Sequence, residues 1–408
     1  MTLATNDPGI RATPETSKAR PAAHVGLVMF ALAMGGFAIG TTEFAVMSLV
    51  PYFSAGLGID EPTAGHVISA YALGVVVGAP IIAVLAARVA RRTLLIGLMA
   101  VFGIANLLSA LAPSYGWMLA FRFLSGLPHG AYFGVAALVA ASISPPGRRA
   151  QSVARVMLGL TVATIIGVPF ANWIGQALGW RWGFGIVAVL AILTMVLIFA
   201  YAPRDTVQPG ASPFRELGAL KRGQVWLTLA IGAIGFGGMF AVYTYLASTL
   251  MEVTQVSPAL VPLVLCIFGL GLTAGTLVGA WAADRALMPS IGGMLLWTAV
   301  SLALFPFATG NIWSISVVVF LIGTSGGLGP MLQTRLMDVA GDAQTLAAAL
   351  NHSAFNAANA LGPWLGGLAI AAGYGWSSTG WVGTALALGG LAIWLIAVLD
   401  DRRATRTL

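Results

Sequence analysis

Long runs of hydrophobic residues alternate with short polar segments along almost the whole chain. Each run is long enough to cross a bilayer as a helix, which takes about 20 residues. The runs are continuously apolar instead of alternating, which excludes a transmembrane β-barrel. The pattern predicts twelve transmembrane helices, at approximately 26–50, 63–87, 93–112, 117–142, 151–176, 181–202, 225–250, 258–283, 289–308, 312–333, 343–372 and 377–399.

Positive charge is confined to alternate connections between these helices. Arginine and lysine gather in every second loop, in the segment between the sixth and seventh helices, and near both termini. The intervening loops are almost free of them, and the first carries Asp60 and Glu61 instead. Because cytoplasmic loops are enriched in Lys and Arg, the pattern predicts that both chain ends lie in the cytoplasm.

The chain divides into two halves of six helices that resemble each other. AARVARR ends the second predicted helix and AADRALM ends the eighth, at an offset near 200 residues. Parallel repeats of this kind are a transporter architecture, with the substrate path between the halves. We therefore expect a disordered cytoplasmic tail, two six-helix bundles joined by a central cytoplasmic loop, and a second cytoplasmic tail. The expected bounds are 1–24, 25–202, 203–224, 225–400 and 401–408.

Composition narrows the classes of protein. Hydrophobic residues make up 58% of the chain and charged residues only 8%, whereas soluble domains carry roughly 25% charged residues. The net charge of +7 comes with no basic patch interleaved with aromatics, so nucleic acid is not an expected partner. The single Cys266 excludes an intrachain disulfide. The chain has no phosphate-binding loop of the G-x-x-x-x-G-K-[ST] type, which argues against an ATPase.

Two charged residues interrupt the apolar runs. Glu43 lies in the first predicted helix and Arg122 in the fourth, each roughly 8 to 10 Å below the outer interface at 1.5 Å per residue. A charge at mid-helix costs roughly 2.5 to 3.5 kcal/mol on insertion scales, and intramembrane ionisable groups are usually functional. We predict that Glu43 exchanges a proton during transport while Arg122 adjusts its affinity for the proton and contacts substrate. The alternatives are a permanent structural ion pair, or a neutral Glu43 bonded to Thr41 or Thr42.

Further polar and aromatic side chains accompany these two. Met47 shares the helical face of Glu43, and His129 and Phe133 share that of Arg122. Histidine titrates near neutral pH, so His129 is a further candidate for proton coupling, although a packed, hydrogen-bonded histidine is equally compatible with the sequence. In the second half, the expected cavity residues are Tyr243, Tyr245, Asn356 and Asn359, each of which could instead join helices together.

Small residues form a stripe on the fifth predicted helix. Gly159, Ala163, Gly167, Ala171 and Gly175 recur every fourth residue, and Pro169 predicts a kink. A glycine-lined face lets helices approach closely. We interpret the stripe as a tight interface at which the two halves move against each other.

Three stretches resemble signatures of the major facilitator superfamily, and within it the twelve-helix drug:proton antiporter branch. They are GTTEFAVMSLVP in the first helix, RFLSGLPHGAYFGVAALVA in the fourth, where Arg122 is the motif arginine, and GLTVATIIGVPFANWIGQALGWRWGF in the fifth. The branch includes exporters of arabinose, other sugars and chloramphenicol. The resemblance covers residues 25 to 400 and implies a central cavity bordered by the first and fourth helices.

One motif departs from the family pattern. The loop after the second helix reads AVLAARVARR, where the family has a sequence close to G-x-L-A-D-R-x-G-R-R. The basic residues Arg88, Arg91 and Arg92 remain, but alanine replaces the aspartate that in the family helps to lock the cytoplasmic gate. The second half keeps an acid as Asp284, before Arg285. We therefore expect the second half to carry more of that lock.

These observations predict an all-α integral membrane protein that exports small organic molecules, such as drug-like compounds, sugars or nucleosides, in exchange for protons. The expected location is the bacterial inner membrane, and the expected partners are substrate, protons and lipid. We expect a monomer that uses the proton gradient and needs no cofactor or metal. A uniporter or a proton symporter on the same fold remains an alternative, and an intramembrane enzyme is a remote one.

Overall fold

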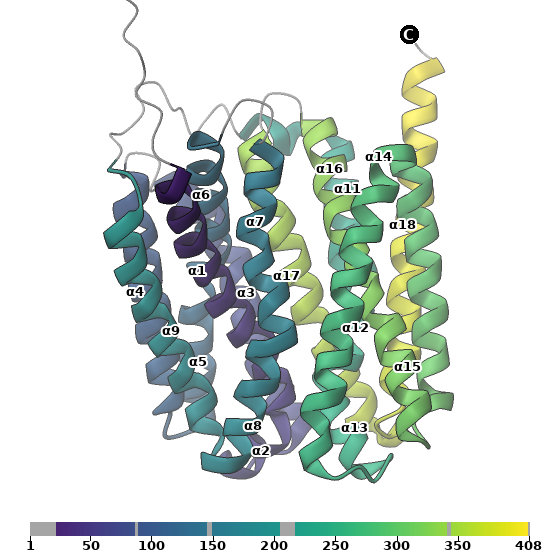
Figure 1. Ribbon diagram of the computed structural model, residues 1–408. Coiled ribbons are helices and arrows are strands. Elements are labelled where there is room, and N and C mark those ends of the chain that lie inside the picture. The colour runs from purple at the N-terminus through teal and green to yellow at the C-terminus, as the bar shows by residue number, and fades with distance from the viewer. Residues whose placement is uncertain (1–21, 86–88, 145–148, 205–216, 341–343, 407–408) are drawn as a thin grey trace, which may run out of the picture.

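The computed structural model describes residues 22–85, 89–144, 149–204, 217–340 and 344–406. These residues form helices and connections, with no strand among them. The helices run roughly parallel and form an upright bundle, and the first described helix begins at the same end at which the last one finishes (Figure 1). We call residues 22–204 the N-terminal half and residues 217–406 the C-terminal half.

The N-terminal half begins with a long helix and contains a π-helical segment, η1, inside its fifth span. Its elements are α1 (Ala22–Ser48), α2 (Val50–Leu57), α3 (Glu61–Leu85), α4 (Arg91–Ala110), α5 (Tyr115–Gly126), α6 (His129–Ser142), α7 (Arg149–Val162), η1 (Ala163–Gly167), α8 (Val168–Leu178) and α9 (Trp180–Tyr201). The expected fourth helix is divided into α5 and α6 at Leu127 and Pro128, because a proline inside a helix removes one backbone hydrogen bond.

The C-terminal half contains more helix breaks than the first. Its elements are η2 (Leu217–Lys221), α11 (Gly223–Gly235), α12 (Gly237–Thr244), α13 (Leu246–Glu252), η3 (Pro258–Leu260), α14 (Val261–Ala308), α15 (Ile312–Gly323), η4 (Thr324–Gly327), α16 (Leu328–Ala340), α17 (Gln344–Ala369), η5 (Ile370–Tyr374) and α18 (Ser378–Arg406). The backbone of α14 leaves the helical conformation at Ala286 (φ −155°, ψ 80°), so this element holds two of the expected spans.

The helices agree with the twelve predicted spans. Ten segments of the described residues are long and apolar enough to cross a membrane, and the two arms of α14 count as one of them. The remaining span is α17, which is missing from those ten. Its sequence includes the polar residues Asn351, His352, Asn356 and Asn359. The all-α fold class is confirmed, and α17 packs extensively against α3 of the N-terminal half.

The glycine stripe does not lie between the halves, and this part of our interpretation is wrong. A side chain at Gly159 would overlap the backbone of Ala33 and Phe37, and one at Gly167 would overlap Thr41 and Phe37. Gly175 faces Leu49, which directly follows α1. The stripe therefore holds the fifth span against α1 within the N-terminal half.

The fifth span meets the other half through a different surface. A side chain at Gly269 of α14 would come within 2.7 Å of the carbonyl oxygen of Thr164 and 3.1 Å of the amide nitrogen of Ile165. Both residues belong to η1, the π-helical segment that precedes Pro169. A π-helical turn widens the helix locally, and such turns are frequent at functional sites. Here it presents backbone atoms to the C-terminal half.

We expect Gly167→Leu to destabilise the N-terminal half instead of separating the halves. The added side chain would displace Thr41 and Phe37, and overpacking of this kind costs roughly 1 to 3 kcal/mol. The measurement is the thermal unfolding midpoint of the purified protein in detergent. Gly134→Leu is the matched control, because a side chain there meets nothing within 4 Å. An unchanged midpoint for Gly167→Leu would show that the stripe is not tightly packed.

The halves contact each other at the end of the bundle opposite to the chain termini. Glu61 at the start of α3 accepts a hydrogen bond from Ser248 of α13. Close by along the chain, the Tyr52 hydroxyl lies 3.8 Å from the sulfur of Met251. Figure 1 shows α2 and α13 together at the lower end. On the orientation that the loop charges predict, this is the outer end, and it is closed.

Candidate functional site

Glu43 lies inside the bundle and is bonded across the two halves. Its side chain is only 6% exposed, and its carboxylate oxygen accepts a hydrogen bond of 3.3 Å from the amide nitrogen of Asn359 on α17. The neighbouring threonines are not its partners: Thr41 donates to the carbonyl oxygen of Phe37, and Thr42 donates to Asn106. The alternative of a Glu43 bonded to either threonine is therefore wrong.

Arg122 is fully buried on α5 but forms no salt bridge with Glu43. One terminal nitrogen donates to the Thr42 hydroxyl at 3.1 Å, and the guanidinium lies 4.3 Å from the centre of the Tyr71 ring. The Nε atom and the other terminal nitrogen have no hydrogen-bond partner. The alternative of a permanent ion pair does not describe this arrangement.

Two histidines from different halves meet on the other side of Arg122. The Tyr71 hydroxyl lies 2.9 Å from Nδ1 of His129, and the rings of His129 and His352 are 6.0 Å apart. Phe133 stacks on His352 with ring centres 5.1 Å apart and planes nearly parallel. A line of contacts therefore runs from Thr42 through Arg122, Tyr71 and His129 to α17.

Several buried polar atoms in this region have no partner. Buried polar groups are normally hydrogen-bonded, so unpaired atoms in one region indicate a place for water or a polar solute. Within the described chain the unpaired atoms near the site are the two nitrogens of Arg122, the hydroxyl of Tyr243, and the side-chain oxygens of Asn356 and Asn359. We call these residues together with Glu43 the central polar cluster. Its unpaired atoms are donors on Arg122 of the N-terminal half and acceptors on Asn356 and Asn359 of α17.

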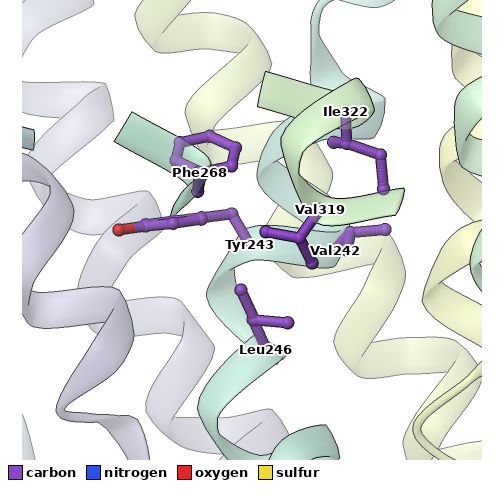
Figure 2. A pocket seen from close by; sticks show the side chains of 6 residues that line it. All are labelled: Val242, Tyr243, Leu246, Phe268, Val319 and Ile322. Carbon is purple, nitrogen blue, oxygen red and sulfur yellow. The ribbon is translucent and has the colours of Figure 1, made fainter. Parts of the chain in front are cut away.

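Tyr243 connects this cluster to an apolar part of the C-terminal half. Its ring lines a small gap together with Val242, Leu246, Phe268, Val319 and Ile322. Figure 2 shows the ring beside Phe268 and the hydroxyl pointing away from Val319, toward the N-terminal helices. The ring of Phe44, the residue after Glu43, lies 5.7 Å from that of Tyr243. The polar end of Tyr243 is thus directed at the interface between the halves.

Two expected cavity residues lie apart from the cluster. Tyr245 donates a hydrogen bond of 3.0 Å to the carbonyl oxygen of Pro363 within the C-terminal half, and its hydroxyl fills the space beside Gly65 and Gly367. It therefore closes the junction of α3 with α17. Met47 is fully buried in the apolar core. Neither side chain makes a hydrogen bond to Glu43 or Arg122.

The structure describes four of the five charged residues expected at the gate. Arg88 is outside the described residues, and Arg91 begins α4. Arg92 donates to the carbonyl oxygen of Phe199 in its own half. Arg285 lies over the ring of Trp281 at 3.8 Å. Asp284 is exposed and makes no hydrogen bond or ion pair with a described residue.

The sequence did not indicate which three side chains hold Arg122 in place. Thr42 accepts its hydrogen bond, Asn106 orients Thr42, and Tyr71 lies beneath the guanidinium. Asn106 carried a signal, since it is a polar residue inside an apolar run. Tyr71 carried none, because a tyrosine in a membrane helix is common and its partners come from other helices.

Comparisons with known proteins agree with this architecture. A model of the Major Facilitator Superfamily matches residues 32–341 and 229–408. The chain is 41% identical over 381 residues to "Inner membrane transport protein YdhP" of Escherichia coli (strain K12), covering 93% of this chain and 97% of that protein. It is 33% identical over 348 residues to "Chloramphenicol resistance protein" of Streptomyces lividans, covering 83% and 87%.

A solved structure has the same fold. It is the crystal structure of a bacterial homolog to the human lysosomal transporter Spinster, and it matches with a TM-score of 0.68 over 95% of this chain and 98% of that one. The sequences are 18% identical, so this likeness concerns the fold alone.

Proposed function

Because the chain belongs to the major facilitator superfamily and is a membrane transporter, not an enzyme, we propose that it exports small organic molecules in exchange for protons across the bacterial inner membrane. The names of its relatives support a location in the inner membrane and transport in the export direction. One is named an inner membrane transport protein and another a chloramphenicol resistance protein. The expected orientation places both chain ends in the cytoplasm.

The observation that carries this proposal is the buried Glu43 and its surroundings. A carboxylate removed from water is costly unless it is paired or protonated, and this one lies at the contact between the two halves. The positive charge of Arg122 nearby favours the ionised form of Glu43, whereas the apolar surroundings favour its protonated form. Rearrangement of the halves changes both influences, so Glu43 can take up a proton in one arrangement and release it in the other.

The side chains of the central polar cluster are suited to bind a neutral, weakly polar substrate. Its unpaired atoms include the donors of Arg122, the acceptors of Asn356 and Asn359, and the hydroxyl of Tyr243. Aromatic rings border it, including Phe44 and Phe133. A molecule with several hydroxyl or amide groups and one apolar face matches this lining, which fits chloramphenicol, sugars and nucleosides alike.

Proton flux during substrate movement tests the proposal. The purified protein is reconstituted in liposomes that contain a pH-sensitive dye, and chloramphenicol, arabinose or a nucleoside is added as a gradient. An antiporter moves protons opposite to the solute, a symporter moves them in the same direction, and a uniporter moves none. Solute transport without any proton movement would overturn the proposal. Failure of all three probes leads to a broader resistance screen in an exporter-depleted host.

A further inference from the structure

The bond between Glu43 and Asn359 joins the two halves inside the bundle. The residues lie 316 positions apart in sequence, on α1 and α17, and Asn359 is fully buried. The amide nitrogen of Asn359 donates to Glu43, while its oxygen has no partner. Thr42 and Arg122 are bonded to other groups, so this amide is the hydrogen-bond donor that Glu43 has among the described residues.

The strength of this bond depends on whether Glu43 carries a proton. An ionised carboxylate only accepts hydrogen bonds, and bonds to an ionised group are roughly twice as strong as neutral ones. The arrangement with Asn359 in place therefore stabilises the anion more than the acid. Since the outer end is closed in the same arrangement by Glu61 and Ser248, proton release from Glu43 is favoured when the outer path is shut.

We propose that Asn359 is a positioning residue that favours proton release from Glu43 in the outer-closed arrangement. This inference rests on the proposed role of Glu43 as the proton carrier. Asn359 stabilises the anion of Glu43 in the outer-closed arrangement. By linkage, protonation of Glu43 therefore shifts the conformational equilibrium toward the outer-open arrangement. Asn359 thereby connects the proton on the N-terminal half to the position of α17 in the C-terminal half.

Other ionisable groups surround this pair and must remain unchanged in a test. Arg122 on α5 donates to Thr42, the residue before Glu43, and lies over the ring of Tyr71 on α3. His129 on α6 is bonded to Tyr71, and its ring lies 6.0 Å from that of His352 on α17. Tyr243 on α12 faces the residue that follows Glu43. None of these donates a hydrogen bond to the carboxylate, which distinguishes Asn359 from them.

Infrared titration of the carboxylic acid band tests the proposal and needs no substrate. The band that disappears in Glu43→Gln belongs to Glu43, and its loss with rising pH reports ionisation. We expect Asn359→Leu, which has a similar shape but no donor, to shift the midpoint to higher pH by about one to two units, from the strength of a bond to a charged group. Asn359→Asp should shift it further, because a second carboxylate repels the first.

A matched control separates this effect from a general disturbance of α17. Asn351 on the same helix donates to Gln333 within its own half, so Asn351→Leu should leave the Glu43 midpoint unchanged. If Asn359→Leu and Asn359→Asp both titrate like the wild type, the proposal is wrong. A variant that does not fold is recognised by its thermal unfolding, and the isosteric Asn359→Asp then decides the question.

This result is independent of whether Glu43 drives transport. Should Glu43→Gln still support proton-driven efflux, the proposed function of Glu43 fails whatever the titration shows. Should Glu43→Gln lose that efflux while the Asn359 variants titrate normally, only the role of Asn359 fails.

Discussion

Proton-driven efflux should be lost in Glu43→Gln, while exchange of substrate across the membrane without a proton gradient is retained. Glutamine has the shape of the protonated acid and can still bond to Asn359, so we expect the bundle to fold normally. It cannot ionise, so the cycle lacks the step in which a proton is released. In liposomes with an imposed proton gradient, accumulation of chloramphenicol, or of the compound that passes the flux screen, should fall to the level of protein-free vesicles.

The pH dependence of the remaining exchange provides a second measure. Exchange by the wild type should vary with pH as Glu43 titrates, and exchange by Glu43→Gln should be flat over the same range. Glu252→Gln is the control, because this carboxylate is exposed at the outer end and is not part of the cluster. Uphill accumulation by Glu43→Gln would show that another group carries the proton, and His129, which is bonded to Tyr71, would be tested next.

The number and order of the helices were predictable because they follow from hydrophobicity alone. Each apolar run is long enough to satisfy its backbone hydrogen bonds inside one helix, which a bilayer requires. Breaks within spans were harder to place. The fourth span was predicted as one helix, and its division at Pro128 was missed although a proline inside a helix is a signal for a break. The π-helical segment before Pro169 depends on how that helix packs against α1 and α14.

The site was predictable residue by residue but not as a set of contacts. Glu43 and Arg122 were conspicuous because a charge inside an apolar run is costly. Their partners were not, since Asn359 and Tyr71 come from helices that are distant in sequence. Charge complementarity suggested an ion pair, but a hydroxyl and an aromatic ring hold Arg122 instead. The glycine stripe was read correctly as tight packing and wrongly assigned to the interface, because sequence periodicity gives a face of a helix and not its neighbour.

Cross-linking the closed outer end should stop transport reversibly. Glu61 and Ser248 touch across the two halves, so cysteines at these positions fall within reach of a short bifunctional methanethiosulfonate reagent. With the native Cys266 replaced by serine, the cross-linked protein should be unable to open its outer end, and efflux should fall to background. Dithiothreitol cleaves the link and should restore efflux.

A second pair of cysteines distinguishes a locked gate from a chemical side effect. His66 and Tyr115 are bonded at 2.9 Å at the same outer end, but both belong to the N-terminal half. A link between His66→Cys and Tyr115→Cys ties two helices that move together, so efflux should continue at the rate of the unmodified pair. If the Glu61–Ser248 link left efflux unchanged, the contact between α3 and α13 would not separate during transport. The two halves would then have to move about another junction, and the backbone contact between η1 and Gly269 would be the one to lock next.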